Sequence, residues 1–575
     1  MPDLKFGDAA PDSEECSAID ALVAAPTLDR RGERWVIGGR TREQEARHLL
    51  LPGLHALQDA MGWISPGGLS YLAERLQVPI ADAYGVATFY DLFHFDPPAS
   101  EQPVHHVCVD PVCAIGNSGS YIAELRAKGA LVHESPCLGQ CERPPAVFIQ
   151  AKNGASSDLS DIAQSPAAVA ADGPLRLLKR IRHMEGSDLQ TYKRHGGYTA
   201  LQAAIETGGA KIIEVLKESG LTGRGGAAFP TGIKWESVAK QEALPKFVVA
   251  NADESEPGTF KDRMILENDP FSLIEAMTIA GISTGCEKGW VYIRGEYTTA
   301  AQRMDRAINE ASASNLLGAG ILGSTFNFDI EIRRGAGAYI CGEETSLFNS
   351  VEGYRGEPRS KPPYPTEQGL FGQPTIVNNP ETFLNVLEIV NYGVDHYRSA
   401  GTPESPGTKL FCLSGDVLHP GLYEAEFGIT LRRLLARAGG VTGDLKAILL
   451  GGAAGSFVDS RQLDMPLTFE DTREEGLSLG SGAVMVFSTG VDIATVLTRL
   501  AKFFREESCG QCVPCRVGTV RQHEVLTQIS NRKPTTREDV LLTEIGSVMT
   551  DASICGLGQT AASAVQSAIQ LGLLR

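Results

Sequence analysis

The chain has 575 residues, 42% of them hydrophobic and 21% charged, and its formal net charge is −18 at pH 7. This length exceeds a single hydrophobic core, so we expect roughly three to five domains. The acidic balance argues against a nucleic-acid-binding role, which requires a basic face. No apolar run approaches the roughly 20 residues that cross a bilayer, and the first residues lack the pattern of a signal peptide, so we expect a cytoplasmic protein without a membrane span.

The N-terminal part of the chain divides into two regions. Residues 1–40 are polar and irregular, and we expect them to form a mobile or partner-docking arm. Between residues 41 and 98, apolar residues recur at spacings of three and four, which predicts a helical bundle.

Four cysteines follow in residues 99–152, where strand-like and helix-like segments alternate as in a small α/β domain. They form a C-x4-C pair and a C-x3-C pair: Cys108 and Cys113, then Cys137 and Cys141. Two close pairs of thiolates are typical of a [2Fe-2S] cluster, with a zinc site or a pair of disulfides as the alternatives. His105 and His106 adjoin the first pair, so a histidine in place of one thiolate stays open.

The sequence pattern divides the rest of the chain into four regions. Residues 153–197 read as a linker whose first part is rich in Ala, Ser and Asp. In residues 198–400, strands run into loops rich in glycine or acidic residues, which predicts an α/β sheet with ligand loops at the strand ends. Residues 409–491 have the pattern of a small β-rich domain, and residues 492–575 are predicted to be helical.

A second cysteine set lies in this last region. It consists of Cys509, Cys512 and Cys515 in E-S-C-G-Q-C-V-P-C, followed by Cys555 in S-I-C-G. The C-x2-C-x2-C spacing wraps one loop around three corners of a cubane and takes the fourth ligand from elsewhere, which predicts a [4Fe-4S] cluster, with zinc as the alternative. Twelve cysteines in a cytoplasmic chain also favour metal binding over disulfides.

Three loops in residues 198–400 have the composition of a nucleotide site. The first, G-R-G-G-A-A-F-P-T-G-I-K-W at 223–235, combines glycines that let the backbone approach a phosphate with the positive charge of Lys234, but lacks the G-K-[ST] of a nucleoside triphosphatase. The second, A-N-A-D-E-S-E-P-G, can accept hydrogen bonds from ribose hydroxyls or flavin N–H groups, or can form a solvated acidic loop. The third, R-R-G-A-G-A-Y-I-C-G-E-E-T, is not a G-x-G-x-x-G fingerprint, so its pattern alone leaves the ligand open.

Together, these loops and E-S-C-G-Q-C-V-P-C-R-x-G resemble the NADH-oxidising flavoprotein subunit of respiratory complex I, and the upstream cysteine region is similar to the [2Fe-2S] partner of that subunit. The resemblance covers nearly all of residues 40–575. It implies a multidomain α/β fold with a helical bundle, a thioredoxin-like [2Fe-2S] domain, a Rossmann-like FMN- and NADH-binding domain, a ubiquitin-like (SLBB-type) β-rich domain with a packing role, and a helical [4Fe-4S] domain. The implied cofactors are FMN, NAD(H), one [4Fe-4S] cluster and one [2Fe-2S] cluster.

The resemblance also implies roles for individual residues. The phosphate side of FMN would be held by Gly223, Arg224, Gly225, Gly226 and Lys234. The other expected cofactor-binding residues of the flavin site are Asn251, Asp253, Glu254, Tyr339, Gly342, Glu343, Asn378 and Asn379. Phe229 and Tyr364 would stack on the NADH base, and Lys361, Glu256 and Glu344 would lie near the dinucleotide, with the two glutamates as catalytic candidates. A carboxylate at Glu344 would repel a 2′-phosphate, so we expect a preference for NAD over NADP.

The fusion of both subunits in one chain resembles the diaphorase subunits of NAD-dependent formate dehydrogenases and of NAD-reducing hydrogenases. The implied reaction exchanges a hydride between NAD and FMN and passes single electrons through both clusters. The expected partner is a molybdenum or tungsten formate dehydrogenase subunit with further iron–sulfur clusters. A [NiFe] hydrogenase is the second candidate and complex I the third, whereas a non-catalytic electron conduit would be a different class of protein.

Overall fold

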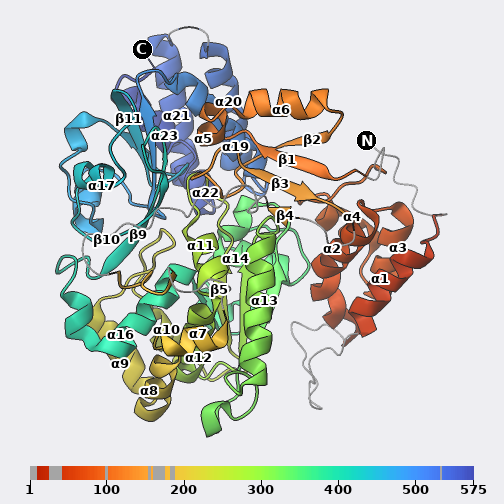
Figure 1. Ribbon diagram of the computed structural model, residues 1–575. Coiled ribbons are helices and arrows are strands. Elements are labelled where there is room, and N and C mark those ends of the chain that lie inside the picture. Colours follow the sequence, from red (N-terminus) through yellow and green to blue (C-terminus); the bar gives the residue numbers. More distant parts are fainter. Residues whose placement is uncertain are drawn as a thin grey trace.

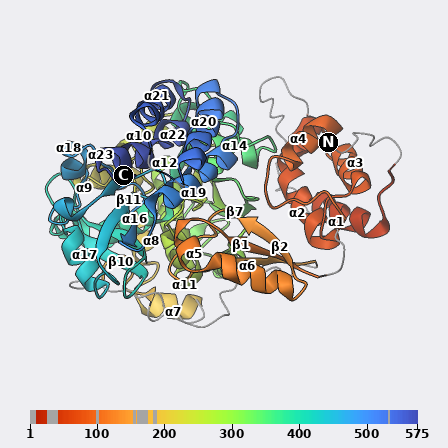
Figure 2. The ribbon, with the colours of Figure 1, turned by 90° about the horizontal axis from the view of Figure 1, so that it is seen from above.

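The computed structural model describes residues 9–24, 42–97, 102–152, 157–158, 175–181, 188–530, 532 and 534–574. Five groups of elements are distinct in Figure 1: a small helical bundle at one side, a sheet in orange, a central sheet, a sheet in cyan and a set of C-terminal helices in blue. The view from above shows the bundle standing out beside the other four (Figure 2).

The helical bundle contains α1 (Ser13–Ala24), α2 (Leu50–Met61), α3 (Pro66–Arg75) and α4 (Ile80–Ala87), with a 3-10 helix at Arg42–Leu49 before α2. Helix α1 corrects the expectation of an irregular N-terminal arm. Asp12 caps it by accepting hydrogen bonds from the backbone N–H groups of Glu14 and Glu15, and Ile19 is fully buried against the bundle. The rest of residues 1–40, apart from 9–12, lies outside the described residues.

The first cysteine set belongs to a four-stranded sheet with the order β2-β1-β3-β4. Its elements are β1 (Val104–Cys108), α5 (Pro111–Ile115), α6 (Ser118–Ala127), β2 (Leu131–Ser135), β3 (Val147–Gln150) and β4 (Ser157–Asp158). Strands β1 and β2 are parallel, and β3 runs antiparallel to β1.

Two described parts of residues 153–197 pack against the rest of the chain and do not form a free linker. Leu177 and Leu178 are buried, and their N–H groups donate to the carboxylate of Glu424. Helix α7 (Leu189–Arg194) buries Tyr192, which stacks near Phe271. Residues 153–156, 159–174 and 182–187 lie outside the described residues.

The largest unit is built on a parallel sheet with the order β7-β6-β5-β8. Its strands are β5 (Phe247–Ala252), β6 (Lys288–Ile293), β7 (Asp329–Arg334) and β8 (Thr375–Asn378). The helices around them are α8 (Thr199–Thr207), α9 (Gly209–Ser219), α10 (Thr231–Ala239), α11 (Lys261–Asn268), α12 (Pro270–Thr284), α13 (Thr298–Ala313), α14 (Glu344–Val351), α15 (Pro365–Gln368) and α16 (Pro380–Arg398). The apolar run of β5 is buried on both faces, as expected for a parallel strand covered by helices, and the carboxyl ends of β5 and β8 bring Asn251 and Asn378 to one edge.

The next unit is a mixed five-stranded sheet with the order β10-β9-β13-β11-β12. Its elements are β9 (Thr408–Gly415), β10 (Gly421–Glu426), α17 (Leu431–Arg437), β11 (Leu445–Leu450), β12 (Ser456–Val458), α18 (Phe469–Glu474) and β13 (Ala483–Ser488). A hairpin, a helix and a parallel central pair of first and last strands form the ubiquitin-like arrangement that the resemblance implies.

The C-terminal region is helical, as predicted. It comprises α19 (Ile493–Glu507), α20 (Val513–Ile529), α21 (Thr536–Ala552), α22 (Gly556–Thr560) and α23 (Ser563–Gln570). Within the described residues, no helix combines the length and the apolar character needed to cross a membrane.

Candidate active site

A cavity of about 540 Å³ lies where the parallel-sheet domain, the ubiquitin-like domain and the C-terminal helices meet. Most of the predicted flavin residues lie on its wall: Gly225, Gly226, Asn251, Asp253, Glu254, Glu256, Tyr339, Gly342, Glu343 and Asn379. The side chain of Asn251 is fixed by donation to the carbonyl oxygen of Gly342 at 2.8 Å. The structure therefore joins all three loops that the sequence singled out.

A second group of predicted residues forms a cluster next to this cavity, and Glu343 belongs to both. Lys361 Nζ lies 2.9 Å from Glu343 Oε1 and 2.7 Å from Glu344 Oε1, and Lys234 Nζ lies 3.9 Å from Glu344 Oε2. Burial opposes the charged form of Lys361, but the carboxylates of Glu344 and Glu343 outweigh it and raise the pKa of this lysine. Cations and carboxylates side by side can meet both the phosphates and the ribose hydroxyls of a dinucleotide.

The two predicted stacking aromatics are exposed. Phe229 is 51% exposed and Tyr364 is 55% exposed, and Lys234 Nζ lies 5.8 Å from the centre of the Phe229 ring. Large exposed aromatic rings leave apolar surface available to a planar ligand.

Three other predicted residues do not line the cavity. Gly223 lies at the start of the first loop, where its N–H donates to Phe229 O. The side-chain oxygen of Asn378 accepts a hydrogen bond from Trp235 Nε1 at 2.9 Å, so this residue positions α10. The third is Arg224, whose side chain points into the protein.

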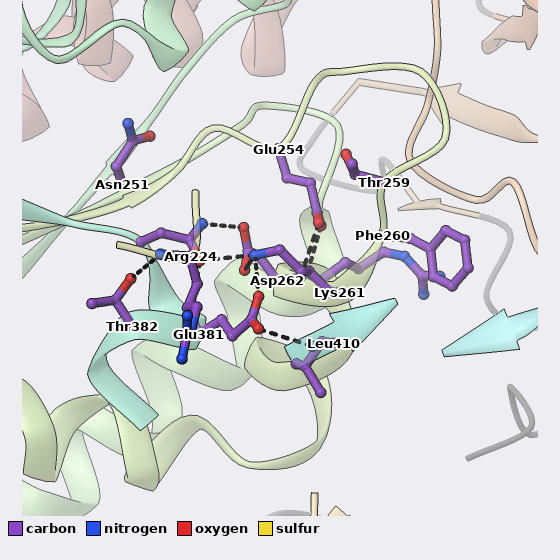
Figure 3. A network of polar contacts seen from close by, with 12 residues as sticks. Arg224, Asn251, Glu254, Thr259, Phe260, Lys261, Asp262, Glu381, Thr382 and Leu410 are labelled. Carbon is purple, nitrogen blue, oxygen red and sulfur yellow. Dashed lines mark hydrogen bonds and ion pairs between the residues drawn. The ribbon is translucent and has the colours of Figure 1, made fainter. Parts of the chain in front are cut away.

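The guanidinium of Arg224 is buried and does not reach the cavity, which corrects its expected contact with the FMN phosphate. Its Nη2 donates to Tyr397 Oη at 2.9 Å and to Pro406 O at 3.0 Å, and its Cζ lies 4.5 Å from the centre of the Phe427 ring. The backbone N–H is also taken, by Thr382 Oγ1 (Figure 3). Because these contacts join the parallel-sheet domain to the start of the ubiquitin-like domain, Arg224 has a structural role.

Burial raises the pKa values of carboxylates in the cavity wall. Burial raises the pKa of Asp253 to about 8 and that of Glu256 to about 7. Asp253 Oδ2 has no hydrogen-bond partner within the chain, which suits an oxygen that meets a ligand. Glu254 differs, since its carboxylate accepts from the N–H groups of Asp262 and Arg263 and so caps the start of α11.

The sequence patterns did not indicate a buried cation beneath the cavity. Lys261 Nζ lies 2.7 Å from Asp262 Oδ1 and 3.3 Å from Glu381 Oε2 (Figure 3). It also lies 2.8 Å from Asn379 Oδ1. Lys261, Asp262 and Asn379 all line the cavity. The available signal was F-K-D-R directly after the acidic loop, where a lysine next to a carboxylate resembles an ordinary solvated pair.

The ubiquitin-like domain also supplies cavity wall, beyond the packing role expected for it. Its contributing segments include Gly451, Ala454–Ser456 and Gly480–Ser481. Ala454 N donates to Glu256 Oε1 at 2.9 Å, and a Cβ on Gly452 would lie 2.6 Å from Glu256 Cδ. The glycine cluster G-G-A-A-G was the signal that could have predicted this close approach.

The first cysteine set converges in the four-stranded domain. Cys108, Cys113, Cys137 and Cys141 are free and buried, and the sulfur atoms of Cys137 and Cys141 lie 3.6 Å apart. Hydrogen bonds from Gly139 N to Cys137 and from Ala146 N to Cys113 point at the sulfur atoms. Four buried thiols that receive backbone N–H groups fit the ligand set of an iron–sulfur cluster.

The second set gathers at one end of the C-terminal helices. Cys509, Cys512 and Cys515 lie between α19 and the start of α20, and Cys555 precedes α22. Helix α22 packs directly on α20, since a Cβ on Gly558 would lie 2.9 Å from Cys515 Cβ, so the loop with Cys555 lies beside the other three cysteines.

Direct contacts connect the cavity to both cysteine sets. Tyr339 N donates to Glu507 Oε2 at 2.8 Å, two residues before Cys509, and the Tyr339 ring lies 5.1 Å from that of Phe503. On the other side, Arg294 Nη2 donates to Cys137 O at 2.7 Å and Arg263 Nε donates to Gly139 O at 2.9 Å. Both cysteine sets are therefore fixed against the domain that carries the cavity.

Both cysteine-bearing domains and the parallel-sheet domain match known protein families. The Nuo51 FMN-binding domain matches residues 216–388, the NADH-ubiquinone oxidoreductase-F iron-sulfur binding region matches residues 495–571, and the thioredoxin-like [2Fe-2S] ferredoxin matches residues 39–164. The F 2 subunit of the NADH-quinone oxidoreductase of Rhizobium meliloti is 44% identical over 398 residues, which are 68% of this chain and 94% of the relative. The HndC subunit of the NADP-reducing hydrogenase of Solidesulfovibrio fructosivorans is 42% identical over 367 residues, covering 63% of this chain and 75% of the relative.

A solved structure extends the similarity to nearly the whole chain. The air-oxidised NAD+-reducing [NiFe]-hydrogenase matches with a TM-score of 0.77 and 32% identity, over 92% of this chain and 93% of the matched chain. Fold, site and comparisons together define a flavin- and iron–sulfur-containing oxidoreductase subunit linked to NAD, with FMN, one [4Fe-4S] cluster and one [2Fe-2S] cluster as its cofactors. The chain belongs to the family of the F subunits of NADH-quinone oxidoreductases, and here this unit is fused to a thioredoxin-like [2Fe-2S] ferredoxin domain.

Proposed function

We propose that the chain is the NADH/NAD+ diaphorase subunit of a cytoplasmic NAD-dependent formate dehydrogenase. The observation that carries the diaphorase assignment is the cavity, whose wall joins all three nucleotide loops and contacts both cysteine-bearing domains. FMN, when bound, exchanges a hydride with the dinucleotide and single electrons with the clusters.

The residues around the cavity have separate roles in this proposal. Gly225 and Gly226 let the backbone approach the FMN phosphate, since a Cβ on Gly225 would already lie 3.2 Å from Asn379. Asn251, Asp253, Tyr339 and Gly342 line the cavity and would surround the flavin. In the outer cluster, Phe229 and Tyr364 stack on the base, while Lys234, Lys361 and Glu344 orient the phosphates and ribose.

The cysteines would hold the clusters. Cys108, Cys113, Cys137 and Cys141 bind the [2Fe-2S] cluster, and Cys509, Cys512, Cys515 and Cys555 bind the [4Fe-4S] cluster. His106 is not needed as a ligand here, because four thiols are present and its Nε2 lies beside Gln150 Oε1.

Electrons would leave beside the second cysteine set. Val513, Val517 and Ile554 expose apolar side chains next to these cysteines, and Val548 lies on the adjacent helix α21. Such a patch is typical of a docking surface, and a partner with its own iron–sulfur cluster fits it best.

The primary substrate depends on the partner. Formate is favoured because a fused chain that keeps both complete cysteine sets looks most like the diaphorase subunits of molybdenum or tungsten formate dehydrogenases. A [NiFe] hydrogenase partner is the second candidate, supported by the near full-length match to the NAD+-reducing enzyme.

The test uses the complex purified natively through this chain. We expect molybdenum or tungsten with no nickel, together with formate-dependent NAD+ reduction. Nickel with hydrogen-dependent NAD+ reduction would overturn the formate assignment and support the hydrogenase. Absence of FMN and of NADH-dependent ferricyanide reduction would overturn the diaphorase itself and favour a non-catalytic conduit.

A further inference from the structure

Three histidines and an aspartate meet where the helical bundle joins the [2Fe-2S] domain. Asp91 and His94 lie in the segment that follows α4, whereas His106 is on β1 and His133 on β2. The register of the two parallel strands pairs His106 directly with His133, and their ring centres lie 4.9 Å apart. Neither the proposed hydride exchange nor the two clusters use these side chains.

The hydrogen bonds of His106 leave one ring nitrogen available. Its Nε2 lies 3.0 Å from Gln150 Oε1, and the orientation of that amide is fixed because Gln150 Nε2 donates to Leu92 O at 3.0 Å. An amide oxygen only accepts, so His106 donates from Nε2 and carries a lone pair on Nδ1. That Nδ1 is buried and has no hydrogen-bond partner. A ring nitrogen without a partner, on an imidazole whose other N–H is held by a carbonyl oxygen, is the usual state of a metal-binding histidine.

His133 and Asp91 supply two further ligand atoms. His133 Nε2 lies 3.2 Å from Asp91 Oδ2, and the ligand atoms of Asp91, His106 and His133 all lie within 4.8 Å of one another. Zinc with bonds of about 2.0–2.1 Å separates tetrahedral ligands by about 3.3 Å, so His133 and Asp91 are already at that spacing, and the third ligand atom lies within 4.8 Å of both.

An ion can reach His133 and Asp91 from solvent. His133 is 36% exposed and Asp91 is 41% exposed, and both line a cavity of about 1040 Å³ together with His94. Buried His106 forms the inner end of the cluster, and the cavity leaves room for a water molecule as a fourth ligand.

We propose that Asp91, His106 and His133 form a binding site for a divalent transition-metal ion, with Zn²⁺ as the ion that imidazole and carboxylate ligands favour. The ion clamps the [2Fe-2S] domain to the segment after α4. That segment in turn contacts the parallel-sheet domain, since Asp91 N donates to Gly337 O and Leu92 N donates to Ala336 O. The site thus joins three domains beside the loop that carries Tyr339, and it does not depend on which substrate the partner oxidises.

The test measures zinc on the holoprotein with both clusters filled, as verified by iron content. After equilibration with ZnCl2 and desalting, we expect the wild type to retain one more zinc per chain than the Asp91→Asn and His133→Ala variants. The zinc K-edge absorption spectrum should show only nitrogen and oxygen neighbours near 2.0–2.1 Å, because thiolates would appear at about 2.3 Å. Both substituted side chains are partly exposed, so folding and iron content should be kept.

A matched control is His396→Ala. His396 Nε2 pairs with Glu388 Oε1 at 3.0 Å, which reproduces a histidine–carboxylate pair without the third ligand, and this variant should bind zinc like the wild type. Equal zinc in the wild type and in the two site variants would overturn the proposal. So would sulfur in the first shell of the extra zinc, which would place the ion on cluster cysteines.

Discussion

Glu256 is the cavity residue whose charge changes nearest to neutral pH. Burial raises the pKa of its carboxyl to about 7, so the side chain is mainly neutral below this pH and ionised above it. An ionised carboxylate in a poorly solvated cavity repels the anionic dinucleotide by about 1 kcal/mol, or roughly fivefold in affinity. We expect KM for NADH in the ferricyanide assay to rise between pH 6 and pH 7.5 in the wild type. It should change little in Glu256→Gln, because Asp253, whose pKa is raised to about 8, stays mainly neutral in this range.

The amide of Glu256→Gln can still accept the hydrogen bond from Ala454, so the cavity shape should persist. Glu424→Gln is the control, because Glu424 is also a buried carboxylate that accepts backbone N–H groups but lies outside the cavity lining. A pH-dependent KM that survives in Glu256→Gln would assign the titration to another group.

Glu344 is the residue expected to set the choice between NAD and NADP. Its carboxylate lies 2.7 Å from Lys361 and 3.9 Å from Lys234, so loss of its charge removes repulsion toward a 2′-phosphate. It also leaves Lys234 without this carboxylate, whereas Lys361 keeps its pair with Glu343. For Glu344→Gln, we expect the ratio of kcat/KM for NADPH to that for NADH to rise about tenfold or more, corresponding to about 1.4 kcal/mol.

The control for this change is Glu214→Gln, which disrupts an exposed lysine–carboxylate pair on α9. Its coenzyme ratio should equal that of the wild type. If Glu344→Gln kept the wild-type ratio as well, Glu344 would not face the adenosine ribose.

At the scale of elements, the loop between β11 and β12 closes the cavity from the ubiquitin-like domain. Gly452 has φ of +88°, and a Cβ there would lie 2.6 Å from Glu256 Cδ. We expect Gly452→Ala to displace the loop and to lower the FMN content of the purified protein severalfold, as measured by flavin absorbance after denaturation.

Gly440→Ala is the control for Gly452→Ala, because it introduces backbone strain without a steric clash of the added Cβ. Gly440 has φ of +94° and no atom within 4 Å of the added Cβ, so it shares only the cost of about 1 kcal/mol for alanine in a left-handed conformation. It should keep its FMN. Equal flavin loss in both variants would mean that destabilisation of the domain, and not the contact with Glu256, releases the cofactor.

Features that depend on local sequence could be predicted, whereas features that depend on long-range packing could not. Local spacing was enough for both cysteine sets, and the glycine and acidic loops predicted most of the cavity wall because ligand loops follow parallel strands. Long-range packing was not predictable: Arg224 looks like a phosphate ligand in its glycine-rich loop, yet Tyr397 and Pro406, far along the chain, bind its guanidinium. Helix α1 was missed because it was assigned to a polar N-terminal arm, and nothing in the local sequence shows that the bundle buries Ile19.

At the scale of the whole molecule, two buried arginines fix the [2Fe-2S] domain to the parallel-sheet domain. Arg263 donates to Gly139 O and pairs with Glu142, both within two residues of Cys141, while Arg294 donates to Cys137 O. These contacts help to hold the cavity and the first cysteine set at a fixed separation. Because electron transfer slows exponentially with distance, the rate at which NADH reduces the [2Fe-2S] cluster reports on this interface.

We expect Arg263→Met to slow NADH reduction of the [2Fe-2S] cluster more than tenfold, because the change leaves Glu142 without its buried partner. Rapid-freeze electron paramagnetic resonance measures this rate. Ferricyanide reduction should stay within about twofold of the wild type, because it draws electrons at the flavin. Dithionite should still reduce the cluster fully, which separates a displaced cluster from a lost one.

Arg461→Met is the control. It removes an exposed pair with Asp459 and should change neither rate. If Arg263→Met reduced its [2Fe-2S] cluster as fast as the wild type, other contacts would have to hold this domain in place.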